Sequence, residues 1–256
     1  MRLAVFITAA SVVTVPAALG PGSAHAAELI VLTGMGSESG VRALAAGFEQ
    51  ASGNRVTVSF ETGPSLNQKL ESSTPADLFT GGPENVEDLI KKGKVVAGTN
   101  TPFAGAGLGV SVKLGGRRPD ISTVEAFKAA LLAAKSIGYS RGCSGTYAAE
   151  GIAKLGIAAA IKSKVTLTGG GPVAEYVARG DVELGIQQTN VMVGVPGADY
   201  VGPLPGFLNK PCPFNVGLMA VSKNQDAARA MIKFMIAPEA TPFLQKAFME
   251  PVRQGS

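Results

Sequence analysis

Residues 28–36 read ELIVLTGMG and begin a pattern that recurs along the chain. The apolar run at residues 29–32 is typical of a buried strand, and a glycine-rich break leads directly into apolar residues at helical spacing. A second expected strand at residues 56–60 (VTVSF) is followed by the break at residues 62–65 (TGPS) and another helix start. Strands and helices that alternate in this way predict an α/β fold with parallel pairing.

The breaks between strand and helix predict where a ligand binds. Small residues there leave the backbone N–H groups of the first helical turn accessible, and the positive end of the helix dipole faces them. A third break stands at residues 74–82 (TPADLFTGG). Three such breaks in succession favour a ligand-receiving half-domain with little reactive chemistry.

The first 26 residues have the features of a cleaved signal peptide. Arg2 supplies the positive start, residues 3–19 are mostly apolar, and residues 24–26 (AHA) have the small-x-small form of a cleavage site. An uncleaved membrane anchor is the competing interpretation, but Thr, Ser and Pro interrupt the apolar segment. We therefore expect a mature protein that begins near Ala27 and lies in the periplasm.

The composition argues against catalysis and nucleic-acid binding. His25 is the only histidine and would leave with the signal peptide, so the mature chain could use neither a Ser-His nucleophile nor an imidazole metal ligand. The 23 basic and 19 acidic residues leave too small a surplus to indicate nucleic acid. We expect a binding protein without enzymatic activity, cofactor or metal. The alternative of another class is a secreted hydrolase.

The order of the expected elements divides the chain into two lobes. Residues 27–104 are the first part of lobe 1, and a stretch rich in glycine and proline then leads into lobe 2, residues 105–212. Lobe 2 repeats the alternation of strands and helices, and residues 213–256 return to lobe 1. Two lobes joined by crossing strands place a ligand cleft between them and permit hinge closure.

Cys143 and Cys212 would lie in a compartment where disulfides persist. Two interpretations stay open, because separation in sequence does not give the distance between the two side chains. The cysteines are either bridged across a long loop or are two buried small apolar residues.

Several segments together resemble the type II periplasmic solute-binding proteins of ABC importers, and in particular the molybdate/tungstate-binding group. They are residues 31–45, 75–79 (PADLF, the most specific), 144–148 (SGTYA), 180–186 and 231–247. The resemblance implies an α/β fold of two lobes, each a mostly parallel sheet flanked by helices, with the ligand cleft between them. It also implies a monomer that delivers a small anionic solute to an ABC permease in the inner membrane. A role in a sensor is the alternative.

The resemblance and the residues beside the breaks together indicate which residues contact the ligand. Gly36 and Gly63 stand where the family has ligand serines, and Gln188 stands where it has a tyrosine. The expected contacts come from both lobes: Met35, Gly36, Ser37, Thr62, Gly63, Ser65, Arg141, Ser144, Gly145, Thr146, Gly170, Gly171 and Gln188.

These departures favour an organic carboxylate, with a molybdate- or tungstate-type oxyanion as the alternative. Arg141 is suited to clamp a carboxylate through two hydrogen bonds, and its competing roles are a surface charge or an ion pair between the lobes. Glu38 and Glu61 would repel an anion unless they point away from the site or pair with Arg141. Met35 is either an apolar wall of the site or a core residue.

Overall fold

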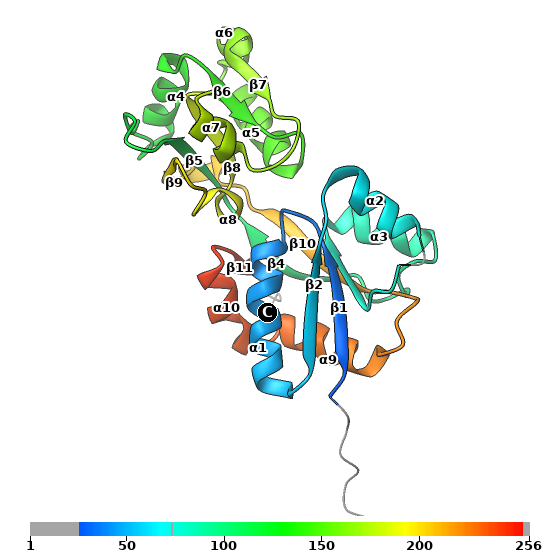
Figure 1. Ribbon diagram of the computed structural model, residues 1–256. Helices are drawn as coiled ribbons and strands as arrows, with labels where there is room; N and C mark the ends of the chain where they lie inside the picture. Colours follow the sequence, from blue (N-terminus) through cyan, green and yellow to red (C-terminus); the bar gives the residue numbers. More distant parts are fainter. Residues whose placement is uncertain (1–25, 73, 253–256) are drawn as a thin grey trace, which may run out of the picture.

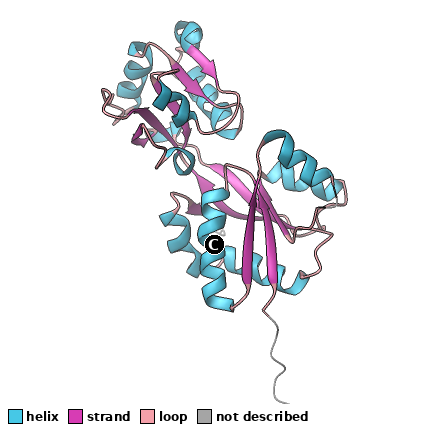
Figure 2. Cartoon of the chain, viewed as in Figure 1, coloured by secondary structure: helices cyan, strands magenta, loops and turns pink. Residues whose placement is uncertain are grey.

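The protein folds into two α/β lobes (Figures 1 and 2). The computed structural model describes residues 26–72 and 74–252, so the expected signal peptide lies almost entirely outside the described residues. Lobe 1 contains a six-stranded sheet in the order β11-β4-β10-β3-β1-β2, and lobe 2 a five-stranded sheet in the order β7-β6-β8-β5-β9. Within the described ranges, no helix is long and apolar enough to cross a membrane.

Lobe 1 is assembled from both ends of the chain. Its strands are β1 (Glu28–Thr33), β2 (Arg55–Phe60), β3 (Leu78–Gly81), β4 (Thr101–Ala106), β10 (Cys212–Leu218) and β11 (Glu250–Pro251). Its helices are α1 (Glu38–Ser52), α2 (Gly63–Glu71), α3 (Pro83–Lys91), α9 (Gln225–Met235), the 3-10 turn η3 (Pro238–Ala240) and α10 (Thr241–Lys246).

Lobe 2 is a continuous insertion between β4 and β10. Its strands are β5 (Leu108–Lys113), β6 (Ile137–Tyr139), β7 (Val165–Leu167), β8 (Leu184–Gln188) and β9 (Ala198–Pro203). Its helices are α4 (Val124–Ala133), α5 (Cys143–Lys154), α6 (Ala158–Ile161), α7 (Val173–Arg179) and α8 (Thr189–Met192), with 3-10 turns η1 (Lys162–Lys164) and η2 (Gly206–Leu208).

Helices cover both faces of the lobe 1 sheet, as the alternation in the sequence predicts. Val41, Leu44 and Phe48 are buried on one face of α1 and belong to a cluster that also includes residues of α9 and α10. A separate apolar cluster contains Val86 and Leu89 of α3, with residues of α2 packed against it. Each fully buried side chain of this kind contributes about 1.5–3 kcal/mol through its transfer from water.

The sheets are mixed, whereas the resemblance implies mostly parallel ones. Parallel pairing is found among β1, β2 and β3 in lobe 1 and among β6, β7 and β8 in lobe 2. The crossing strands β5 and β10 pair antiparallel with all their neighbours, because each enters its sheet from the side of the other lobe.

Residues 101–106 form a strand inside the stretch that we expected to be an irregular crossing. Strand β4 pairs with β10 on one side and β11 on the other, and Phe103 and Ala104 are buried. The chain therefore leaves the lobe 1 sheet after Ala106, and it re-enters that sheet at Cys212. Partners distant in sequence stabilise this strand in spite of its glycine and proline content.

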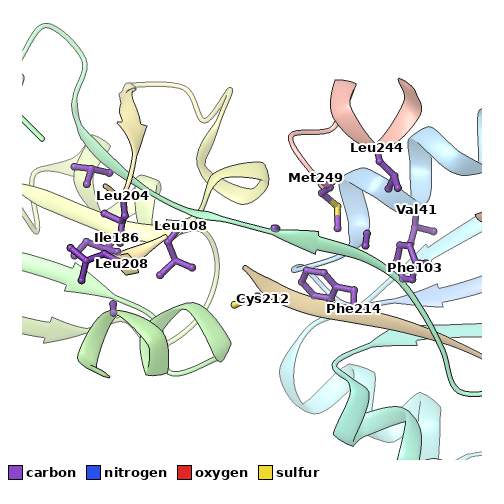
Figure 3. Packing of buried hydrophobic residues seen from close by; sticks show 14 of the residues in the cluster. Val41, Phe103, Leu108, Ile186, Leu204, Leu208, Cys212, Phe214, Leu244 and Met249 are labelled. Carbon is purple, nitrogen blue, oxygen red and sulfur yellow. The ribbon is translucent and has the colours of Figure 1, made fainter. Parts of the chain in front are cut away.

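The two crossing segments run side by side between the lobes. Gly107 separates β4 from β5, and the Asn209 side-chain carbonyl oxygen accepts a hydrogen bond from the Leu108 N–H at 2.8 Å. A Cβ at Gly107 would lie 2.5 Å from that oxygen, so a side chain here would displace the Asn209 amide from its hydrogen bond. Buried apolar side chains continue from Leu108 and Ile186 on the lobe 2 side to others in lobe 1, with Cys212 between them (Figure 3).

Candidate functional site

A cleft of about 890 Å³ is lined by residues of both lobes. Its walls form where parallel strands end: β1 and β3 in lobe 1, and β6, β7 and β8 in lobe 2. The carboxyl ends of parallel strands and the N-termini of the following helices meet at one edge of a sheet, which is where α/β proteins bind ligands. The cleft therefore has the position expected from the sequence.

Helices α1, α3 and α5 begin at the cleft without a side-chain cap. The N-cap residues of α1, α3 and α5 are Ser37, Gly82 and Gly142; each lines the cleft, and none accepts a capping hydrogen bond through its side chain. Backbone N–H groups of the first turn are thus available at the positive ends of these helices, an arrangement that favours anions. Helix α7 differs, because Gln187 Oε1 already accepts from the Val173 N–H at 2.6 Å.

Most of the residues expected to contact the ligand line this cleft: Met35, Gly36, Ser37, Gly63, Arg141, Thr146, Gly170, Gly171 and Gln188. The other four expected residues do not. Ser65 Oγ donates to Glu61 Oε2 at 2.7 Å and lies within 2.9 Å of the Thr62 carbonyl oxygen, and both Ser65 and Thr62 are exposed. Ser144 and Gly145 are buried residues in the first turn of α5.

Gly145 has a packing role that the sequence did not indicate. A Cβ at this position would overlap the Ser140 carbonyl oxygen, which belongs to the turn between β6 and α5. The neighbouring hydroxyl groups of Ser140 and Ser144 hydrogen-bond to each other at 3.1 Å. The turn that carries Arg141 is therefore held tightly against the first turn of α5.

Replacing Gly145 with alanine should lower the free energy of unfolding by about 1–3 kcal/mol, the usual cost of overpacking. Gly142→Ala is the matched control, because a Cβ there meets only the Ser140 hydroxyl oxygen, at 3.9 Å. Urea unfolding of both variants measures the difference. Equal stabilities would contradict the close packing at Gly145.

The Ser37 hydroxyl is part of a buried ring of three hydroxyl groups. Ser37 Oγ lies 3.0 Å from Thr33 Oγ1 and 3.1 Å from Thr80 Oγ1, and Thr80 Oγ1 donates to Thr33 Oγ1 at 2.8 Å. Ser37 is 1% exposed. These bonds fix the start of α1 against the end of β3, and Thr80 joins Ser37 in lining the cleft.

Gly36 lies where the two lobes touch. A Cβ there would be 2.8 Å from two ring atoms of Phe214 and 3.2 Å from the Gln188 side-chain nitrogen. From lobe 2, Asn190 Nδ2 donates to the Gly36 carbonyl oxygen at 2.9 Å and to Ser39 Oγ at 3.0 Å. The Phe214 ring thus occupies the space that a side chain at position 36 would need.

Two charged side chains line the cleft in the described part of the chain, Arg141 from lobe 2 and Glu84 from lobe 1. Arg141 is exposed and makes no ion pair with any described residue. Glu38 and Glu61, which could have repelled an anion, pair instead with Arg42 at 2.8 Å and Lys69 at 2.6 Å. The hydrogen bond from Lys69, with a second from Ser65, lowers the pKa of the Glu61 carboxyl.

Sequence reasoning missed several lining residues. The expected break at residues 74–82 in fact contains the whole of β3, and it did not single out Thr80, Gly81, Gly82 or Asn85. Thr168 begins the glycine-rich break after β7 and could have been found in the same way. Tyr147 and Phe214 carried no local signal, because their place in the cleft depends on how α5 and β10 pack.

The structure joins Cys143 and Cys212 by a disulfide, with a Cα–Cα distance of 6.0 Å. Cys143 is the first residue of α5 in lobe 2, and Cys212 is the first residue of β10 in the lobe 1 sheet. The bridge therefore connects the two lobes beside the cleft, which Cys143 lines. No group of three or more potential metal ligands occurs among the described residues.

Comparison with known proteins places this architecture in a family. The "Aconitate isomerase" of Pseudomonas sp. is 26% identical over 230 residues, covering 88% of each chain. The molybdate-binding protein ModA of Azotobacter vinelandii is 28% identical over 246 residues, covering 89% of this chain and 93% of that protein.

Solved structures agree on the fold. The periplasmic molybdate-binding protein of Azotobacter vinelandii superimposes with a TM-score of 0.67 at 17% identity, over 86% of this chain and 98% of that one. The family model described as "Bacterial extracellular solute-binding protein" matches residues 29–250. These findings confirm the resemblance inferred from the sequence, and the chain belongs to the bacterial extracellular solute-binding proteins.

Proposed function

We propose that this protein is a monomeric periplasmic receptor that binds a small organic polycarboxylate in its cleft and delivers it to an ABC permease. The observation that carries the proposal is the pairing of Arg141 with the uncapped start of α5. A free guanidinium beside backbone N–H groups at a helix N-terminus offers a carboxylate two charge-assisted hydrogen bonds and a favourable dipole.

The charges in the cleft orient such a ligand. Arg141 lies on the lobe 2 side, and Glu84, in the first turn of α3, lies on the lobe 1 side. The carboxylate of Glu84 offsets the positive end of α3, so lobe 2 attracts an anion more strongly than this part of lobe 1 does. A ligand carboxylate should therefore bind against Arg141 and α5.

The apolar wall of the cleft supports an organic skeleton. Met35, Leu66, Phe79, Tyr147 and Phe214 all line it. Its volume is within the range of about 300–1,000 Å³ that is usual for small-molecule sites. A tetrahedral oxyanion is best held by polar donors on all sides. Neither Phe214 nor Gly36 has a side-chain hydrogen-bond donor to offer it.

The names of the curated relatives support two ligand classes. Aconitate, named in one of them, is a six-carbon tricarboxylate, and ModA is named for molybdate. The site favours the first class for the reasons above. The oxyanion is the alternative that an experiment must test.

We further infer that binding is not followed by chemistry. An isomerase needs groups that remove and return a proton, and histidine is absent from the mature chain that we expect. Cys143 is held in a disulfide. Apart from Arg141, the ionisable groups left among the described cleft residues are Glu84 and Tyr147, which come from different lobes.

The test measures binding of citrate, trans-aconitate, sulfate and molybdate to the protein by thermal unfolding and by calorimetry. A bound tricarboxylate at about 100 times its Kd should stabilise the protein by about 2.7 kcal/mol. Proton NMR of aconitate incubated with the protein then separates binding from isomerisation, and we expect an unchanged spectrum. Stabilisation by molybdate alone would support the oxyanion alternative, and a changed aconitate spectrum would show an enzyme.

A further inference from the structure

Thr168 follows the last residue of β7 and lines the cleft, yet its hydroxyl has no hydrogen-bond partner. The residue is 3% exposed, and among the described residues no group bonds to its Oγ1 atom. Its backbone is well fixed, since the Thr168 N–H donates to the Tyr139 carbonyl oxygen at 3.0 Å. The unpaired group is therefore the side chain of an ordered residue.

Several other buried hydroxyl and amide groups near the cleft have partners. Ser37 and Thr80 share bonds with Thr33, Ser144 bonds to Ser140, and Gln187 accepts from the Val173 N–H. Of the described residues that line the cleft, only Thr168 has a buried side-chain oxygen left without a partner. Burying an unpaired hydroxyl disfavours folding. A purely structural role therefore does not explain why position 168 carries a hydroxyl group.

Thr168 lies beside the turn that carries Arg141 and leads into α5. Strands β6 and β7 pair in parallel with Tyr139 opposite Leu167, so Ser140 and Thr168 are the next residues along the two strands. Ser140 leads directly into Arg141 and the start of α5. Thr168 is followed by Gly169 and Gly170, which have no other protein atom closer than 3.9 Å to an added Cβ.

We propose that the Thr168 hydroxyl donates a hydrogen bond to the ligand carboxylate that Arg141 binds. This inference rests on the proposed polycarboxylate function and adds a contact residue to it. No internal hydrogen bond holds the hydroxyl in its present rotamer, so turning Oγ1 toward the ligand breaks none. The ligand then satisfies a group that the protein leaves unpaired, which makes Thr168 a determinant of affinity.

Thr168→Val separates this role from a structural one, because valine has nearly the same shape and lacks the hydroxyl. The variant without ligand should be as stable as the parent protein or more stable, since an unpaired buried polar group is removed. Affinity for citrate or trans-aconitate, measured by calorimetry, should fall about 10-fold or more, as expected for a lost hydrogen bond to a charged group. Thr168→Ser keeps the hydroxyl and should retain most of the affinity.

Thr166→Val is the matched control, because Thr166 is an exposed residue of the same strand outside the cleft. It should change neither stability nor affinity appreciably. Equal tricarboxylate affinity in Thr168→Val and the parent protein would overturn the inference while the proposed function stands. A parent protein that binds no carboxylate would overturn both, and a Thr168→Val variant clearly less stable than Thr166→Val would show that the hydroxyl is paired after all.

Discussion

Replacing Arg141 with alanine should weaken carboxylate binding by tens-fold or more. Arg141 is the free cation of the cleft in the described part of the chain, and closure of the lobes would remove its ion pair with the ligand from water. Truncating one partner of a buried charge pair typically costs about 2–5 kcal/mol. Calorimetry with the tricarboxylate identified by the ligand panel measures the loss.

Arg141→Lys should recover only part of the affinity, because an ammonium group cannot reproduce the two parallel hydrogen bonds of a guanidinium. Arg229→Ala is the matched control: it removes one positive charge from an exposed position on α9, away from the cleft. This control should bind like the parent protein. Tight molybdate binding that neither substitution at Arg141 changes would refute the carboxylate assignment and leave the solute-binding role intact.

Removing the disulfide should lower the free energy of unfolding by about 4 kcal/mol. The cysteines are 69 residues apart in sequence, and the chain-entropy relation gives a cost of that order for a loop of this length. The double variant Cys143→Ser/Cys212→Ser avoids leaving a single free thiol. Urea unfolding of the variant and the oxidised parent protein measures the effect.

The same double variant tests the mechanical role of the bridge. Because Cys143 belongs to lobe 2 and Cys212 to the lobe 1 sheet, loss of the bond should allow the lobes to separate further without ligand. Small-angle scattering should then show a larger radius of gyration for the ligand-free variant than for the ligand-free parent protein. Two free thiols in the unreduced parent protein, detected by mass spectrometry, would remove the basis of both expectations.

Local patterns predicted much of the fold. Strands β1 and β2 lie within a few residues of their expected positions, and helix α1 follows the first break as expected, because buried runs and helical spacing are properties of short segments. The main omission in lobe 1 was β4. Glycine and proline make this segment look irregular, and only its pairing with β10 and β11 forms the strand.

The site was predicted less completely, because it too depends on contacts between segments that are distant in sequence. Met35, Gly36, Arg141 and Gly170 were among the expected contacts, and all of them line the cleft. Thr62 and Ser65 looked equally suitable in the sequence, yet they lie on an exposed turn where Ser65 bonds to Glu61. A break identifies which helix start faces a ligand, but not which side chain of that turn points toward it.

The sequence by itself determined the class of the protein: two α/β lobes, helix starts free of bulky side chains, and a mature chain expected to lack histidine. These features depend on residue type and on spacing over a few positions. Only the tertiary structure decided that Phe214 excludes a side chain at Gly36, that Cys143 and Cys212 connect the lobes, and that the Thr168 hydroxyl is left unpaired. Each of these depends on which distant segments come into contact, and strand register and packing of the whole chain set those contacts.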